Sequence, residues 1–280
     1  SLLHFNLIVN LRFNHNRRTM NNILVPIGTS PDSSKTLQYA VDFAVHFGAK
    51  IYVMDVISVA TAMGSLANVE EKVAKNSKEH LKEVIEQVDT KNVEIKIATY
   101  NGDIVDGLND INKELGIDLI IIAPRSNDIQ EELYLGNTSG RIIKQTEIPT
   151  LIVPKGTAFK PIKKIMTAFG SGILKRSSIL SPLVTIKNKF KSEVSLLLVK
   201  RPGYSEDDLK VNTALLDLSK KLTITENATT YLGVTEFYHE EHPDMLCVFR
   251  RKRGFFKKLW EKNTILKSEF YVPVPVLVLS

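Results

Sequence analysis

The stretch Ile23-Leu24-Val25-Pro26-Ile27-Gly28-Thr29-Ser30 decides the fold, because a similar stretch returns as Ile165-Met166-Thr167-Ala168-Phe169-Gly170-Ser171. Three more segment pairs follow in the same order: Ala49–Val56 with Ser192–Val199, Ile117–Ile121 with Pro243–Cys247, and Ile148–Val153 with Val274–Leu279. Ile165 follows Ile23 by 142 residues and Asp244 follows Asp118 by 126, so the second half has lost about 16 residues between its second and fourth strands. Such self-similarity predicts two copies of one structural unit.

Short apolar runs alternate with helical patterns inside the first half. The apolar runs at 23–27, 51–57, 93–99, 119–123 and 150–153 predict strands, and helical spacing predicts helices after Ser30 and over 66–88, 104–115 and 140–145. Strands without polar alternation are typical of a parallel sheet covered on both faces. We therefore expect an α/β fold of two tandem, doubly wound, mainly parallel five-stranded domains of the Rossmann-like type. Each half is expected to form its own sheet, and a pseudo-two-fold axis relates the halves.

The domain limits follow from the repeat. Residues 20–156 form the first domain and residues 161–280 the second, separated by a Lys/Gly/Thr/Pro stretch. Residues 1–19 are an N-terminal extension that we expect to be weakly ordered, either preceding a natural start at Met20 or forming a real arm. Apolar strands after Thr150 and Val274 end the two halves, and because an unpaired apolar edge favours aggregation, we expect these edges to cover each other.

Composition excludes several classes of protein. The chain of 280 residues is 43% hydrophobic and 24% charged, as in a globular protein with a sizeable core. The single cysteine, Cys247, excludes an internal disulfide and a cysteine-based zinc site, and indicates a reducing, cytoplasmic location. No apolar run approaches the ~18 residues of a membrane helix, so no membrane partner is expected. The net charge of +6 is mildly basic, and nucleic acid is not favoured as a partner.

Candidate ligand-binding residues follow the first and fourth strands, because ligands of doubly wound sheets bind beyond the carboxyl ends of the strands. Gly28, Thr29 and Ser30 follow the first strand. Polar residues and then a helix start, with Thr138 and Ser139, follow the fourth. Backbone amides and hydroxyls at a helix start can bind phosphate. The alternative is that the segment from Gly136 to Gly140 only caps a helix.

The order and spacing of these motifs resemble the universal stress protein family in its tandem two-domain form, from Ile23 to Val153 and from Ile165 to Leu279. The first half carries Ile-Leu-Val-Pro (23–26), Ile-Asp-Leu-Ile-Ile-Ile-Ala (117–123), Leu-Gly-Asn-Thr-Ser-Gly-Arg-Ile-Ile (135–143) and Ile-Pro-Thr-Leu-Ile-Val-Pro (148–154). The second half adds His-Pro-Asp-Met-Leu (242–246) and Val-Pro-Val-Leu-Val-Leu (274–279).

The resemblance implies at most one ATP or AMP site per chain. Family members that bind ATP carry Gly-x2-Gly-x9-Gly-[Ser/Thr] after strand four and an Asp after strand one. The first half keeps this spacing with Ala123, Ser126, Gly136 and Asn137, and has Gly28 at the Asp position. The implied cofactor-binding residues are Gly28, Thr29, Ser30, Ala123, Ser126, Gly136, Asn137, Thr138 and Ser139. Because phosphate loops need glycine at positive φ, we expect Gly136→Val to abolish any binding.

The second half departs further from that motif. Phe249, Lys252 and Lys262 stand at its glycine positions, and we place Phe169 where the Asp is expected and where the side chain would crowd a ribose. The second half is therefore not expected to bind ATP.

Other candidate residues have simpler explanations. The basic cluster Arg250, Arg251, Lys252, Arg253, Lys257 and Lys258 could bind anions, acidic proteins or nucleic acid, but a solvated loop and helix start is the favoured interpretation. His239 and His242 are three residues apart, not four as in the His-Glu-x-x-His zinc motif, which indicates a helix end. Cys247 is interpreted as a small buried hydrophobe and Trp260 as a packing residue.

Two functions remain open, and an enzymatic function is a third, less favoured hypothesis. The first is a non-enzymatic stress-response protein that acts through an unknown protein partner, its halves paired within the chain or in a homodimer. The second is a signalling module that binds ATP or AMP through the first domain. An adenylylating or pyrophosphatase enzyme would need a Ser-Gly-Gly-x-Asp-Ser-like loop, which Gly28–Ser33 and Phe169–Gly172 match only faintly. With no nucleophile beside an evident base, no catalytic or metal site is expected.

Overall fold

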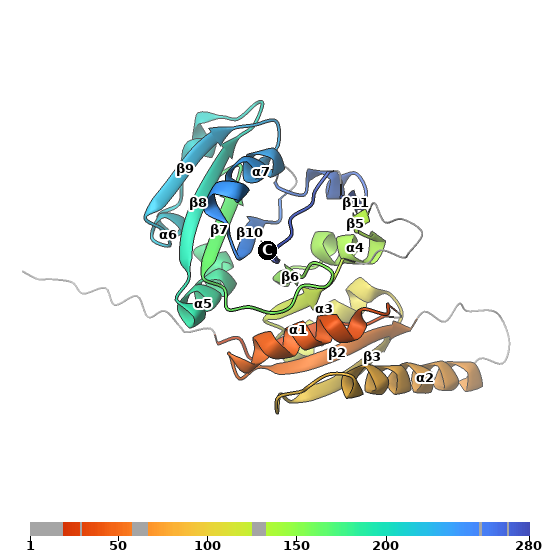
Figure 1. Cartoon of the computed structure of the whole chain (residues 1–280). Coiled ribbons are helices and arrows are strands. Elements are labelled where there is room, and N and C mark those ends of the chain that lie inside the picture. The colour runs from red at the N-terminus through yellow and green to blue at the C-terminus, as the bar shows by residue number, and fades with distance from the viewer. Residues whose placement is uncertain (1–18, 29, 58–66, 125–132, 252–253, 268) are drawn as a thin grey trace, which may run out of the picture.

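The computed structural model describes residues 19–28, 30–57, 67–124, 133–251, 254–267 and 269–280 (Figure 1). The first half has the strands β1 (Asn22–Pro26), β2 (Lys50–Ile57), β3 (Ile95–Asn101), β4 (Leu119–Ile122) and β6 (Thr150–Ile152). Its helices are α1 (Ser33–Val45), α2 (Ala67–Glu86), α3 (Ile104–Leu115) and α4 (Asn137–Gln145). The repeated apolar runs therefore form strands, and each crossover between parallel strands contains a helix.

The second half repeats the order of the five strands, but two of the helices of the first half have no α-helix of similar length in their place. Its strands are β7 (Lys164–Phe169), β8 (Glu193–Lys200), β9 (Lys221–Glu226), β10 (Met245–Phe249) and β12 (Val276–Leu279). Its helices are α5 (Ser181–Phe190), α6 (Thr213–Leu216) and α7 (Thr230–Glu241), with the short 3-10 turns η1 (Ser177–Leu180), η2 (Glu206–Leu209) and η3 (Lys257–Trp260). Between β8 and β9, η2 and α6 stand where the first half has the long helix α2. The residues missing from the second half are thus those of a covering helix.

Each half has the predicted five parallel strands, in the orders β3-β2-β1-β4-β6 and β9-β8-β7-β10-β12. The expectation of two separate sheets is wrong, because β6 and β12 pair antiparallel and join the halves into one ten-stranded sheet. Leu151 and Leu277 are register partners in this pair and both are fully buried. Pairing the two apolar end strands satisfies backbone groups that would otherwise form two open edges.

Two hydrophobic cores lie on opposite faces of the sheet. One contains side chains of α1, α2 and α5, such as Phe43, Leu81 and Ile186. The other contains side chains of α3, α4 and α7, such as Leu108, Ile142 and Val234. Helices from both halves therefore share each core, as expected for a sheet that continues across the junction. Across the described residues, we find no helix with the length and apolar character that a membrane crossing requires.

The repeated aspartates have a structural role that is the same in both halves. Asp118 accepts backbone hydrogen bonds from Asn21 and Asn22 at 2.8 and 3.0 Å, which fixes the start of β1. Asp244 accepts the backbone hydrogen bonds of Lys163 and Lys164, both at 2.8 Å, at the start of β7. Each carboxylate thus ties the start of its own strand to the first strand of its half.

Several boundaries differ from the sequence-based expectation. Lys91 and Asn92 have φ of 49° and 62° in a turn just before the predicted third strand, and β3 begins at Ile95, two residues later than predicted. Helix α4 begins three residues before Gly140. The unexpected β5 (Leu133–Leu135) pairs antiparallel with β11 (Ile265–Leu266) of the second half, in a separate two-stranded sheet. Tyr134 of β5 packs edge-on against Phe270, with 4.5 Å between ring centroids. Non-local packing, not local pattern, produces this pair.

Candidate functional site

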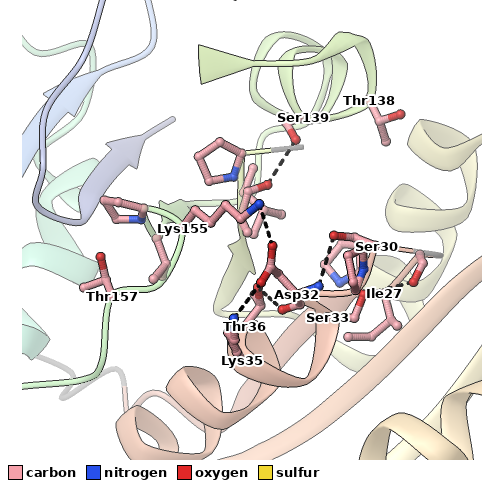
Figure 2. Close-up of a pocket in the computed structure, with 18 of the residues that line it drawn as sticks. Ile27, Ser30, Asp32, Ser33, Lys35, Thr36, Thr138, Ser139, Lys155 and Thr157 are labelled. Atoms are coloured by element: carbon pink, nitrogen blue, oxygen red, sulfur yellow. Dashed lines mark hydrogen bonds and ion pairs between the residues drawn. The ribbon is translucent and has the colours of Figure 1, made fainter. Parts of the chain in front are cut away.

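A hollow lies beyond the carboxyl ends of β1 and β4, where the strand order of the first half reverses. Parallel sheets bind ligands at this switch point. Residues from the start of α1, the end of β4, the start of α4 and the segment after β6 line it: Pro26–Gly28, Ser30–Ser33, Lys35, Thr36, Ile122–Pro124, Thr138, Ser139, Ile142 and Val153–Thr157. Figure 2 shows Ser30, Asp32, Ser139 and Lys155 arranged around it.

The structure brings together about half of the predicted site. Gly28, Ser30, Ala123, Thr138 and Ser139 line the hollow. Gly136 and Asn137 are described but do not line it; Gly136 is buried and Asn137 is exposed to solvent. The predicted residues Thr29 and Ser126 lie outside the described residues.

Asp32 and Lys155 form an ion pair across the hollow that the sequence analysis did not predict. The Asp32 carboxylate lies 3.0 Å from Lys155 Nζ and 2.9 Å from Lys35 Nζ, and its side chain is only 17% exposed (Figure 2). The hydrogen bonds to Lys35 and then to Lys155 lower the pKa of Asp32 below its ordinary value. Asp32 is therefore ionised at neutral pH and places a negative charge in the hollow. Asp32 lies where the sequence analysis expects the helix after Ser30 to begin, but only the tertiary structure brings Lys155 to it.

The hydroxyl groups around the hollow hydrogen-bond to the backbone. Ser33 donates to the Gly28 carbonyl oxygen at 2.9 Å, and Ser139 donates to the Ala123 carbonyl oxygen at 3.4 Å. The Ser30 hydroxyl accepts the Asp32 backbone N–H at 3.3 Å. His80 of α2 also reaches the Gly28 carbonyl, with Nε2 at 3.1 Å. These bonds hold the turn after β1 in place, and none of them activates a hydroxyl as a nucleophile.

The expected need for glycine conformational freedom at Gly136 is wrong. Gly136 is the residue before α4, with φ of −74° and ψ of 173°, an extended conformation that any residue adopts. Glycine is instead required at Gly140, where an added Cβ would overlap the backbone carbonyl oxygen of Asn263 in the second half. The close approach of the two halves therefore explains why residue 140 is a glycine.

Protein side chains fill the corresponding position in the second half. Gly170 matches Gly28 in the strand register, and Phe169 matches Ile27, so the expected placement of Phe169 at the Asp position is wrong. Phe169 belongs to the hydrophobic core and stacks edge-on against Phe249 at 6.2 Å. The Arg201 guanidinium lies against Gly170, 2.5 Å from where a Cβ would stand.

The preferred interpretation of the basic cluster as a solvated loop is wrong for its first two residues. Arg250 donates to the carbonyl oxygens of Lys144 and Thr146 at the end of α4, and its side chain is only 17% exposed. Arg251 donates to the carbonyl oxygens of Ser171 and Ile173, and its guanidinium lies 5.3 Å from the Phe249 ring centroid. Burial lowers the pKa of both arginines. Lys252 and Arg253 lie outside the described residues, and Lys257 is exposed.

Two structural interpretations are confirmed. Cys247 is a free, fully buried cysteine of β10, and burial raises the pKa of its thiol. His242 ends α7 with φ of 46°, so the two histidines mark a helix end. Among the described residues, no group of His, Cys, Asp and Glu side chains is placed to hold a metal ion.

Comparison with known proteins agrees with this architecture. Residues 19–154 match the family model described as the universal stress protein family. A universal stress protein from Methanocaldococcus jannaschii is 25% identical over 138 residues, which cover 48% of this chain and 81% of the relative.

Two solved structures are similar over almost the whole chain. A universal stress protein from Archaeoglobus fulgidus has a TM-score of 0.65 and 17% sequence identity to this chain. The alignment covers 94% of this chain and 97% of the other. For a putative universal stress protein from Pseudomonas aeruginosa the TM-score is 0.56, with 14% identity and 93% of each chain covered. At these identities the likeness shows the fold, which here includes both halves. Residues 19–154 therefore form a domain of the universal stress protein family, and the fold seen in structures of that family extends over both halves of the chain.

Proposed function

We propose that the protein is a non-enzymatic stress-response protein that acts through contacts with a protein partner. One observation carries this proposal: the Asp32–Lys155 ion pair crosses the hollow in which the sequence analysis expects a nucleotide. A phosphate bound there would have to displace the ionised Asp32 carboxylate from Lys35 and Lys155. The negative charges of the phosphate and the carboxylate would also repel each other. In the described part of the second half, Arg201 and Phe249 occupy the matching space.

The chemistry of the lining supports a role without catalysis. Ser33 and Ser139 donate their hydroxyl protons to backbone carbonyl oxygens, and Ser30 accepts a backbone N–H. A nucleophilic serine needs a base within hydrogen-bond reach, and the described lining residues do not provide one. The ion pair and the hydroxyls therefore stabilise the turn after β1.

Calorimetric titration with ATP and AMP tests the proposal. We expect no saturable heat with the wild-type protein, and no increase in thermal stability, because a ligand selective for the native state would raise it. Crosslinking in the source cells should recover one stoichiometric protein partner, and the same complex should form with the Asp32→Asn, Lys155→Ala double variant. Saturable nucleotide binding by the wild type, or loss of the partner from the double variant, would overturn it.

The second candidate function is a signalling module with one ATP or AMP per chain, bound in the first half. The observation that favours it is that α1 and α4 both begin at the hollow, with Thr138, Lys35 and Lys155 among the lining residues. Helix starts and lysines attract phosphate. If this candidate is correct, Asp32→Asn should strengthen binding about tenfold by removing the competing carboxylate, and Lys155→Ala should weaken it.

A further inference from the structure

Strand β9 exposes apolar side chains on a face of the sheet that is covered elsewhere. Leu222 is 37% exposed and Ile224 is 51% exposed. Their register partners in β8 are Leu196 and Leu198, which are buried in the core shared with α5. Register partners of parallel strands point to the same face, so Leu222 and Ile224 extend that core to the edge of the sheet, where they meet solvent.

The first half shows what covers this face when it is complete. There α2 lies along β2 and β3 (Figure 1), and its residues Leu81 and Val84 are buried in the same core. In the second half the turn η2 and the short α6 precede β9; Leu215 of α6 is fully buried in this core, but Leu216 is 41% exposed. These short elements therefore cover less of the face than α2 does, and Leu222 and Ile224 stay exposed at its edge.

The edge itself is open to pairing. Strand β9 has one hydrogen-bonded neighbour, β8, among the described strands, so its outer backbone groups face outward. Natural edge strands are commonly blocked by proline, a bulge or a central charge. Lys-Leu-Thr-Ile-Thr-Glu (221–226) has none of these in its centre, and its flanking charges are opposite: positive at Lys220 and Lys221, negative at Glu226.

We propose that β9 pairs antiparallel with β9 of a second copy of this chain, around a two-fold axis at Thr223. In this register Leu222 lies opposite Ile224 of the second copy, and Lys220 lies opposite its Glu226. The apolar contact and the charge pair each occur twice, because a two-fold interface is self-complementary. Residues that face each other keep to the same side of the sheet, so the exposed apolar side chains of the two copies meet.

Charge and backbone chemistry favour a strand of a second copy over a partner's helix. A helix would cover Leu222 and Ile224 but leave the outer N–H and C=O groups of β9 unpaired, whereas a strand satisfies them. Lys220 has no ion pair among the described residues, and Glu226 is 71% exposed although it lies 3.3 Å from Lys200. Both charges are therefore available across the axis, where cross-strand pairs of opposite charge stabilise the pairing. The inference concerns β9 alone and does not depend on the proposed function.

Sedimentation velocity of the full chain over a concentration series tests the pairing. We expect a closed dimer, and we expect Ile224→Lys to raise its dissociation constant at least about tenfold, or 1.4 kcal/mol. Lys220→Glu and Glu226→Lys should each weaken the dimer, because each places like charges opposite one another. The double variant should restore the dissociation constant to within about threefold of the wild type, because it re-forms both pairs.

Controls separate this surface from general damage. Val45 of α1 is 43% exposed and far from β9 in sequence, so Val45→Lys should leave the dimer unchanged. Circular dichroism of every variant checks that the fold is retained. A monomer at all concentrations, open-ended growth with concentration, or charge variants that the double variant does not rescue would each overturn the proposal. A wild-type monomer that binds a peptide of residues 67–86 would overturn it in favour of a helix.

Discussion

The two halves share one fold but differ at the carboxyl ends of their strands. In the first half a hollow remains there, spanned by Asp32 and Lys155. In the second half Arg201 lies against Gly170, and Phe249 replaces the small Ala123. The starts of the strands are alike, since Asp118 and Asp244 make the same pair of backbone hydrogen bonds. The duplicated protein thus retains the contacts that build the sheet and varies those that could hold a ligand.

A second difference concerns covering rather than binding. Helix α2 covers the outer strands of the first half, and the second half lacks this helix. Its edge residues Leu222 and Ile224 are exposed as a result. Loss of one covering helix leaves the five-stranded order intact, because that order depends on strand pairing and on the cores around β7, β8 and β10.

The largest change in stability is expected for a substitution at the contact between the two halves. Gly140→Ala should lower the free energy of unfolding by about 3 kcal/mol, because the added methyl group would overlap the Asn263 carbonyl and force the halves apart. Chemical denaturation measures this loss. Alanine normally stabilises a helix interior relative to glycine, so the sign of the change identifies the contact.

Gly107→Ala is the matched control for that variant. Gly107 also lies in a helix of the first half, but its added methyl group would meet only side chains, the end of Met54 and the ring of the half-buried Tyr100, and no backbone atom is among its nearest neighbours. Its loss should be clearly smaller. Equal losses in the two variants would mean that the contact between the halves is not tightly packed.

A smaller change in stability is expected for the aspartates that have the same role in both halves. Asp118→Ala and Asp244→Ala should each cost about 2 kcal/mol of unfolding free energy, because each removes a charged acceptor from two backbone N–H groups. The corresponding Asn variants keep a neutral acceptor and should lose less. A much larger loss for one aspartate than for the other would show that the halves do not contribute equally to stability.

The smallest change in stability is expected for a substitution in the hollow, which is present in the first half and filled in the second. Asp32→Asn should cost less than about 1 kcal/mol at pH 7, because both lysines are largely exposed and water screens the pair. The pKa of Asp32 is lowered in the folded protein, so its contribution is complete above the ordinary carboxyl pKa of about 4 and is lost as the pH falls through the folded value. The unfolding free energies of the wild type and the variant should therefore become equal at acidic pH.

Asp110 provides the comparison for that titration. It pairs with Lys113 at 2.9 Å on an exposed helix surface, and this pair also lowers the pKa of Asp110. Asp110→Asn should change stability too little to measure, since both side chains are more than half exposed. If Asp32→Asn shows no pH-dependent difference either, the ion pair across the hollow is no stronger than one on the surface.

The sequence by itself determined the parallel strands, the duplication and the missing segment. These features depend on local apolar runs and on their repeat, which can be read without knowledge of contacts. The bounds of α3, for example, match the periodicity at both ends. The sequence also predicted that Gly28, Ser30, Ala123, Thr138 and Ser139 would lie beyond β1 and β4, because strand order fixes which ends converge.

Only the tertiary structure decided the pairing of Asp32 with Lys155, the hydrogen bonds of Arg250 to α4 and the contact of Gly140 with Asn263. Each joins residues more than 100 positions apart, and no local pattern specifies such a contact. The β5–β11 pair belongs to the same class. Long-range packing places these groups together, and it holds Gly140 and the first two residues of the basic cluster in internal contacts of the fold.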